Sequence, residues 1–218
     1  MSTQVALIGI GHSKISPTTP EYSYKELIHE AARAAYQDAG LNSHRDIDGF
    51  VTCAEDLIEG TSIFDEYTPD QLGAVQKPVH TVTGDTLHGL IVATMKIQTG
   101  LMDVVAVEAH SKASNIETYE HITHFALDPT WNRPLNVHPY FISGLDMNYY
   151  MKISKTTEAQ VAAVVSKNKR HALKNELACC SENISTDQVL TSAYAFEPVR
   201  EAFIAPHIDG AFVFVLAS

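Results

Sequence analysis

The sequence contains little cysteine: three residues, Cys53, Cys179 and Cys180, in a chain of 218. Adjacent cysteines such as Cys179 and Cys180 rarely pair with each other, so the chain is not a disulfide-stabilised scaffold. It also lacks a Cys-x-x-Cys pair and a Walker-type glycine-rich loop. A cysteine-based zinc module and a P-loop nucleotide site are therefore excluded.

Basic residues are scarce as well. Lysine and arginine number 15 against 26 acidic residues, which gives a formal net charge of −11. Because nucleic-acid binding needs clustered cations to neutralise phosphates, we expect no nucleic-acid partner. The one basic cluster lies at Lys167 to Lys174.

Long apolar runs are missing too, and the N-terminus has neither the basic start nor the apolar stretch of a signal peptide. We therefore expect no membrane association and a cytoplasmic location. With 45% hydrophobic and 19% charged residues, the composition is that of a globular protein rather than a disordered one.

Short apolar runs alternate with helical patterns. The run Val5–Gly11 predicts a strand buried on both faces, and further strands are expected at Ile47–Cys53, Val79–Val82, Met102–His110 and Asp209–Ser218. The capping box Ser23-Tyr24-Lys25-Glu26 predicts a helix to about Ala39, and a second helix is expected over Asp85–Thr99. This order predicts an α/β fold with a mostly parallel sheet covered on both faces.

The Gly9-x-Gly11 pair follows the first apolar run, but the third glycine of a dinucleotide fingerprint is missing and no helix follows directly. We reject a Rossmann site here. Residues 111–155 show no sustained period, and a loop region of that length is usually functional or an interface. Capping boxes at Thr157 and Ser185 predict two further helices.

The junction between Val79 and Gly100 is chemically the most informative stretch. It predicts a strand, a tight turn and then a helix whose N-terminus points at whatever lies beyond the turn. Such a helix start carries free N–H groups and a positive dipole end, which suit an anion or a developing oxyanion.

In its order of segments the chain resembles the N-terminal half of a thiolase of the sterol-carrier-protein or archaeal type. The likeness rests on Val5–Lys14, Glu30–Leu41 with Asp46–Gly49, Ile97–Val105, Ser166–Asn175 and Ile208–Ala211 with the apolar strand that follows. These segments are collinear with the family over the whole chain.

The resemblance implies a thiolase-like three-layer α/β/α fold with a five-stranded mixed sheet. It implies a long loop excursion, about residues 111–205, between the fourth and fifth strands of one N-terminal domain over residues 1–218. It also implies a dimer joined through the third strand. In thiolases a second, similar half packs on the first and carries the histidine and second cysteine that move protons.

The thiolase resemblance places the nucleophile position at or next to Thr83, where the family's cysteine is replaced by Thr83-Gly84-Asp85. A threonine hydroxyl is a far weaker nucleophile than a thiolate, and only Asp85 and His88 are nearby in sequence to act as a base. We therefore predict a noncovalent acid/base site at Thr83, Asp85 and His88, as in thiolase-like aldolases that lack the cysteine. In the alternative, Asp85 only caps the helix and His88 is a packed helix residue.

Two further groups of side chains are candidate ligand-binding sites. Lys167, Lys169 and Arg170 could contact the phosphates of coenzyme A, or they could form a solvated helix face. His121-x-x-His124, with His110 and His138 nearby, could suggest zinc, but no acidic or cysteine partner has a suitable spacing. We expect a structural role for these histidines and no metal.

These observations favour a subunit of a hetero-oligomeric thiolase-like complex. It would act on a coenzyme A thioester as substrate, without a covalently bound cofactor and without a covalent cysteine intermediate on this chain. The reaction would be C–C bond formation or cleavage, acyl transfer or retro-aldol. The expected partner is a second thiolase-like chain, a zinc-ribbon/OB-fold subunit, or both. The alternatives are a catalytically silent structural subunit and an acyl-CoA binding module.

Overall fold

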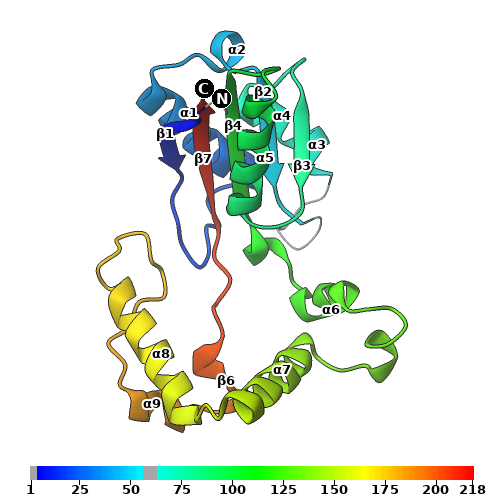
Figure 1. Cartoon of the computed structure of the whole chain (residues 1–218), viewed down its shortest axis with the longest axis vertical. Helices are drawn as coiled ribbons and strands as arrows, with labels where there is room; N and C mark the ends of the chain where they lie inside the picture. Colours follow the sequence, from blue (N-terminus) through cyan, green and yellow to red (C-terminus); the bar gives the residue numbers. More distant parts are fainter. Residues whose placement is uncertain (1–3, 56–62) are drawn as a thin grey trace. The chain divides into compact units, whose positions relative to one another are not determined.

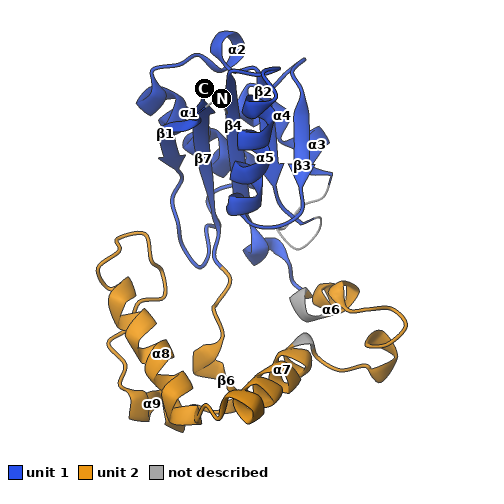
Figure 2. Ribbon diagram, in the orientation of Figure 1, with its two compact units in different colours: residues 1–117, 208–218 blue, residues 118–207 orange. Residues whose placement is uncertain are grey.

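A computed structural model describes residues 4–55 and 63–218 of the chain. The chain forms two compact units: the first contains residues up to Glu117 and from Ile208 onward, and the second spans Thr118–His207 (Figure 2). Each unit has a hydrophobic core of its own. Within the described ranges, no helix combines the length and the apolar content needed to cross a membrane.

The first unit is built on a five-stranded sheet (Figure 1). Its strands are β1 (Ala6–His12), β2 (Gly49–Cys53), β3 (Val79–Val82), β4 (Val104–Ser111) and β7 (Gly210–Ala217), in the order β1-β7-β4-β2-β3. β2 pairs in parallel with β3 and β4, whereas β7 runs antiparallel to both of its neighbours. This confirms the predicted five-stranded mixed sheet, in which four strands share one direction.

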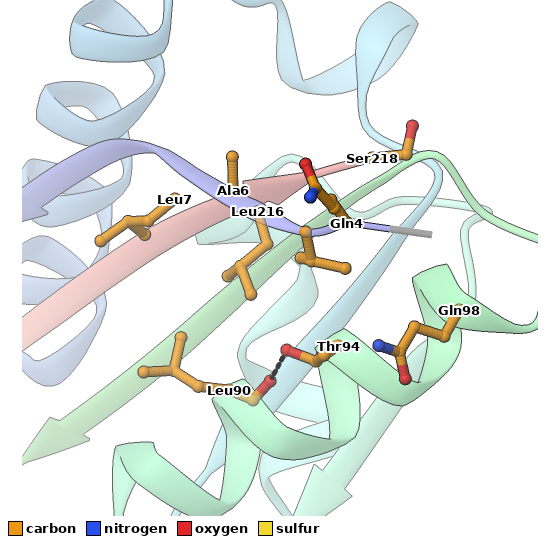
Figure 3. Close-up of a pocket in the computed structure, with 9 residues that line it drawn as sticks. Gln4, Ala6, Leu7, Leu90, Thr94, Gln98, Leu216 and Ser218 are labelled. Carbon is orange, nitrogen blue, oxygen red and sulfur yellow. Dashed lines mark hydrogen bonds between the residues drawn. The ribbon is translucent and has the colours of Figure 1, made fainter. Parts of the chain in front are cut away.

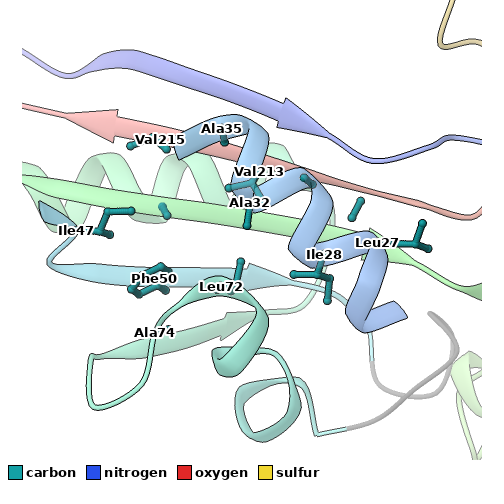
Figure 4. Packing of buried hydrophobic residues seen from close by; sticks show 13 residues of the cluster. Leu27, Ile28, Ala32, Ala35, Ile47, Phe50, Leu72, Ala74, Val213 and Val215 are labelled. Carbon is teal, nitrogen blue, oxygen red and sulfur yellow. The ribbon is translucent and has the colours of Figure 1, made fainter. Parts of the chain in front are cut away.

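One face of the sheet is covered by helix α1 (Tyr24–Ala39), which begins with the predicted capping box at Ser23 and ends at Gly40 in the left-handed conformation. Gly9 and Gly11 of β1 let the helix backbone approach closely. A Cβ added at Gly11 would lie 2.1 Å from the carbonyl oxygen of Ala31. The Gly9-x-Gly11 pair thus serves helix–strand packing. The core on this face contains Leu27, Ile28, Ala31, Ala32, Ala35, Ile47, Phe50, Leu72, Ala106, Val213 and Val215 (Figure 4).

The opposite face is covered by helix α5 (Thr86–Gln98). Its buried side is small, with Gly89 and Ala93 against the sheet. A Cβ at Gly89 would lie 2.2 Å from the sulfur of Cys53 and 2.8 Å from Val107 Cγ1, so only glycine fits there. The core here contains Val51, Cys53, Ala93, Ile97, Val105, Val107 and Leu216. The sheet therefore lies between two helix layers, as the three-layer α/β/α prediction requires.

Short helices complete the first unit. They are α2 (Ser43–Asp46), α3 (Phe64–Tyr67), α4 (Pro69–Leu72) and the 3-10 turn η1 (Ala113–Asn115). Phe64 and Leu72 place their side chains in the interior.

The prediction that the first strand is buried on both faces is wrong. β1 is an edge strand, and its glycines face α1 while Leu7, Ile8 and Ile10 are exposed by 37–49%. A continuous apolar run does not distinguish a strand covered twice from one whose second face is left open.

The second unit consists mainly of helices: α6 (Tyr119–Thr123), α7 (Pro139–Ser154), α8 (Glu158–Ala172) and α9 (Thr186–Thr191). It also contains the two-stranded sheet of β5 (Tyr194–Phe196) and β6 (Val199–Arg200), and the 3-10 turns η2 (His124–Ala126), η3 (Arg133–Leu135) and η4 (Glu201–Phe203). The predicted capping boxes at Thr157 and Ser185 are both formed. Ser166 joins α8 to the following loop by donating to the Ile184 carbonyl at 2.7 Å.

Helix α7 lies inside residues 111–155, for which the sequence predicted a loop region, so that expectation was wrong for its last third. Apolar side chains in α7 do not mark a buried stripe. Leu145, Tyr149 and Ile153 follow one another at four-residue intervals, yet all three are more than half exposed. Apolar residues lie on all sides of α7, so its sequence lacks the contrast between an apolar and a polar face by which a helix is recognised.

A buried ion pair joins the points where the chain leaves and re-enters the first unit. Lys112, just after β4, and Asp209, just before β7, are 2.7 Å apart and almost fully buried. Asp209 also accepts hydrogen bonds from the backbone and hydroxyl of Thr19 (2.8 and 2.9 Å) and from the hydroxyl of Ser114 (2.6 Å). Burial alone would raise the pKa of Asp209, but hydrogen bonds from Lys112, Ser114 and Thr19 outweigh it, and the pKa is lowered.

We predict that Lys112→Met destabilises the chain by about 3–5 kcal/mol, because the Asp209 carboxylate is left buried without its cation. Urea unfolding at pH 7 measures the change. The control is Lys14→Met, which removes the exposed Lys14–Glu21 pair and should leave the free energy of unfolding almost unchanged. Equal losses in the two variants would contradict the prediction.

The same pair gives the stability a pH dependence. The pKa of Asp209 is lower in the folded than in the unfolded chain, so its contribution is present above the unfolded value of 3.8 and is lost as the pH falls through the folded pKa. The gap in stability between the native chain and Lys112→Met should therefore shrink below about pH 4.

Candidate functional site

A cavity of about 390 Å³ lies where several strand ends meet the start of α5. The C-terminal ends of parallel strands lie at one edge of a sheet, and that edge is where ligands bind in open α/β folds. The lining comes entirely from the first unit: Ile15, Cys53, Gly84, Asp85, Thr86, Leu87, Ala109, His110, Ser111, Ile208, Gly210 and Phe212.

The predicted strand–turn–helix junction is present, with β3 ending at Val82 and α5 beginning at Thr86. Gly84 in the turn has φ +121°, and a Cβ there would lie 3.0 Å from Nδ1 of His88. The turn is therefore built on glycine and lies against the His88 ring. The helix presents its positive dipole end at the rim of the cavity.

Asp85 occupies the N-cap position of α5, but its side chain accepts no hydrogen bond from the helix. The alternative in which Asp85 only caps the helix agrees with its position, but no side-chain hydrogen bond to the helix accompanies it. Thr83, Asp85 and His88 are all exposed. Of these three, Asp85 lines the cavity, whereas Thr83 and His88 lie beside it on the turn and the first turn of α5. Their catalytic role stays a prediction.

Cys53 ends β2 directly beneath the first turn of α5 and is 2% exposed. Burial, and secondarily the negative charge of Glu108, raise the pKa of the Cys53 thiol to about 12. At neutral pH this sulfur is therefore a protonated thiol, which is neither a good nucleophile nor a metal ligand. It forms part of the cavity wall rather than a reactive group at the helix tip.

On the α1 side of the sheet, Glu108 and His110 form a buried pair that sequence reasoning did not find. His110 Nδ1 lies 2.7 Å from Glu108 Oε1, and the Thr52 hydroxyl donates to the other carboxylate oxygen. The His110 ring stacks on Tyr24 and meets the edge of Phe64. Both side chains of the pair are fully buried, so the His110 ring is sealed from the cavity.

Lys167, Lys169 and Arg170 lie on α8 in the second unit. Lys167 is exposed, Lys169 pairs with Glu182 at 3.2 Å, and Arg170 donates back to the Ser166 carbonyl at 3.4 Å. Of the three cations, Lys169 is thus already paired with a carboxylate and Arg170 with a backbone carbonyl. Their contact with coenzyme A phosphates stays a prediction.

The histidines that could have suggested zinc have other surroundings. His110 belongs to the buried pair with Glu108, and His138 is the N-cap of α7, where its Nδ1 accepts from the backbone of Tyr140 at 3.1 Å. His121 and His124 line a separate cavity of the second unit. Over residues 4–55 and 63–218, no group of three or more metal-binding side chains is arranged to hold an ion.

A second cavity, a groove of about 800 Å³, lies between α5 and the part of the sheet that this helix does not cover. Leu90, Thr94 and Gln98 of the helix face Leu7 of β1 and Leu216 of β7 across it (Figure 3). Next to this groove, the outer stripe of α5 exposes Leu87, Ile91 and Met95 by 70%, 53% and 60%. We call Leu87, Ile91, Met95 and the groove-lining Leu90 and Leu7 the α5 surface.

Several cavity residues were not predicted as site residues from the sequence, namely Ile15, Cys53, Ser111, Ile208 and Phe212. A signal was available, because Cys53 ends a predicted strand, Ser111 directly follows another and Phe212 lies near the start of a third. Residues at those positions converge at one edge of a sheet.

Two archaeal acetyl-CoA acetyltransferases are similar to the chain in sequence. The protein of Methanothermobacter thermautotrophicus (strain Delta H) is 24% identical over 219 residues, covering 97% of this chain and 56% of that protein. The protein of Methanocaldococcus jannaschii is 25% identical over 215 residues, covering 95% and 54%. The chain therefore spans about half the length of these curated relatives. No protein-family model matches the chain.

Solved structures share the fold. The structure described as an Ltp2-ChsH2(DUF35) aldolase superposes with a TM-score of 0.78 at 23% identity, over 98% of this chain and 55% of that one. An acetyl-CoA acetyltransferase from Syntrophomonas wolfei gives a TM-score of 0.76 at 15% identity, over 100% and 65%. These likenesses confirm the expected thiolase-like fold.

We predict that iodoacetamide at pH 8 modifies Cys179 and Cys180, which are partly exposed, at least ten times faster than Cys53. The reason is the burial of Cys53 and its pKa of about 12. Peptide mass mapping of native and urea-unfolded protein measures the three rates, with the unfolded chain as the control. Rapid alkylation of Cys53 in the native chain would show that it is a thiolate after all.

Proposed function

The chain is related to the thiolase superfamily and has its fold, and we propose that it works as one half of a thiolase-like enzyme on acyl-CoA thioesters. The reaction forms or cleaves a C–C bond next to the thioester, by acyl transfer or retro-aldol chemistry. It proceeds without a covalent cysteine intermediate on this chain. In this proposal a second thiolase-like chain packs on it.

The α5 surface is the observation that carries this proposal. A helix that lies on a sheet should keep its apolar residues inside, yet α5 exposes Leu87, Ile91 and Met95 at four-residue intervals. The neighbouring groove adds Leu7 and Leu90. Contiguous exposed apolar surface of this kind marks a binding site for another protein.

A second half that covers the α5 surface also agrees with the lengths of the relatives, because this chain matches only 56% and 54% of them. In thiolases, as the resemblance implies, the second half packs on the first and supplies a histidine and a cysteine. Leu87 belongs both to the α5 surface and to the lining of the cavity. A partner seated on that surface would therefore reach the cavity rim with its own catalytic groups.

The chemistry we propose for this chain is acid/base and electrostatic. In the retro-aldol direction, Asp85 or His88 takes the proton of the β-hydroxyl group, the C–C bond breaks, and its electron pair forms the thioester enolate. The start of α5 stabilises the enolate oxygen, and a proton returns to carbon. Lys167, Lys169 and Arg170 hold the phosphates of coenzyme A in the same proposal.

We propose two kinds of partner for this chain. A zinc-ribbon/OB-fold subunit is proposed beside the second thiolase-like chain, and the structure described as Ltp2-ChsH2(DUF35) is a two-component aldolase by its name. β3 is the edge strand at the far end of the sheet, so its outer side is available for the dimer contact that the thiolase resemblance implies.

A catalytically silent structural subunit is the second candidate. It is favoured by the neutral thiol of Cys53 and by the exposure of Asp85 and His88. An acyl-CoA binding module remains the third, and it predicts affinity for coenzyme A esters without turnover.

We predict that Ile91→Glu combined with Met95→Glu abolishes assembly, because two charges would be buried against an apolar partner. The chain is co-expressed with the second thiolase-like chain of its native host, and the masses of the complexes are measured by light scattering. Leu173→Glu, at an equally exposed apolar position of the second unit, is the control and should assemble normally. If the native chain is active as a homo-oligomer without a second polypeptide, the two-chain proposal is wrong.

We predict that Asp85→Asn or His88→Gln in the assembled complex lowers kcat by 10²–10⁴, the usual contribution of a general acid or base. The complex must keep its mass and its affinity for acyl-CoA. Unchanged turnover in both variants would identify this chain as the silent subunit.

A further inference from the structure

We infer that the cavity beneath α5 binds the acyl group of the thioester, and that it selects short, uncharged, apolar chains. This inference rests on the proposed function, whose substrate class it narrows. It depends on a row of side chains that crosses the sheet under the helix and on the absence of cations from the described lining.

The row follows from the strand register. Cys53 of β2 pairs with Ala109 of β4, Ala109 pairs with Phe212 of β7, and Phe212 pairs with His12 of β1. Paired residues place their side chains on the same face, with Cβ atoms about 5 Å apart. This is the α5 face, because Cys53 contacts Gly89 of that helix.

The small side chain of Ala109 makes the cavity hollow. It stands in the row between Cys53 on one strand and the large ring of Phe212 on the other. The Phe212 ring is fixed from its other side by His12 (centroids 6.0 Å apart) and by Phe214 (6.5 Å). A methyl group flanked by a fixed aromatic ring leaves space that a chain of a few carbons can occupy.

The chemistry of the lining is apolar. Ile15, Leu87 and Ile208 surround the hollow, and Cys53 contributes a neutral thiol because its pKa is raised to about 12. His110 lines the cavity as well, but its ring is buried on the α1 side of the sheet. The walls therefore favour hydrocarbon over polar groups.

The charges in the lining also discriminate between acyl groups. The described lining contains one carboxylate, Asp85, and no lysine or arginine. The positive end of α5 lies at the rim, where the thioester oxygen would be placed. An acyl group that ends in a carboxylate would carry its charge beyond the rim into the apolar pocket, where it would be desolvated without a cationic side chain to pair with. Butyryl and succinyl groups both have four carbons, so they separate this effect from size.

The test is calorimetric binding of coenzyme A and its acetyl, butyryl, hexanoyl and succinyl thioesters to the full chain, alone and with its partner chain. We expect affinity to rise about threefold to fourfold for each methylene buried, up to the length that fills the cavity. Succinyl-CoA should bind at least tenfold more weakly than butyryl-CoA.

Substitutions in the row formed by Cys53, Ala109 and Phe212 test whether these side chains set the preference for acyl-chain length. Ala109→Leu fills the hollow and should remove the gain of butyryl-CoA over coenzyme A, whereas Phe212→Ala should move the preference to longer chains. Leu216→Ala, on the same face of the same strand but outside the cavity lining, is the matched control and should leave chain-length preference unchanged. Thermal unfolding of each variant verifies that it is folded.

Affinity that does not depend on chain length, or that responds equally to Phe212→Ala and Leu216→Ala, would overturn the inference and leave the proposed function standing. If no coenzyme A ester binds, the proposed function is overturned. The cavity is then probed with S-butyryl-N-acetylcysteamine, followed by NMR: binding that Ala109→Leu removes supports the inference, and no binding overturns it.

Discussion

The structure of the first unit depends on one buried carboxylate. Asp209 accepts hydrogen bonds from Thr19, Lys112 and Ser114, so its carboxylate joins three stretches of chain: the one around Thr19, the one at 112–114 and its own. An isolated buried charge would be very costly, so all of these groups must be present together. The residues next to them include Ser111, Ile208 and Gly210 of the cavity lining. The bonds that stabilise the fold therefore also fix the shape of the site.

At the site, the start of a helix that can stabilise negative charge lies beside a pocket wall that has no reactive sulfur. Cys53 is close to α5, yet its burial keeps it protonated, and Gly89 is needed to leave room for it. The same sulfur that would be a nucleophile in an electropositive, exposed setting is here a packing atom. Environment, rather than residue type, decides what this cysteine does.

Much of the fold could be predicted from the sequence, because the signals were local. Capping boxes at Ser23, Thr157 and Ser185 begin helices where expected, and the apolar runs mark the five strands. The open face of β1 could not be predicted, because a continuous apolar run does not show which face is covered, and α7 could not be predicted, because apolar residues lie on all of its sides. At the site, the turn at Thr83–Asp85 was found, but the row Cys53–Ala109–Phe212 depends on strand order and register, which no single segment encodes.

The position of β7 has a consequence for how the molecule is made. This strand follows the whole second unit in sequence, yet it lies between β1 and β4 and supplies hydrogen bonds to both. During synthesis on the ribosome, the edges of β1 and β4 that pair with β7 therefore stay unpaired until β7 emerges. The helices of the second unit depend on nearby contacts and can form during this interval, whereas the sheet must close through long-range pairing, which is the slower process.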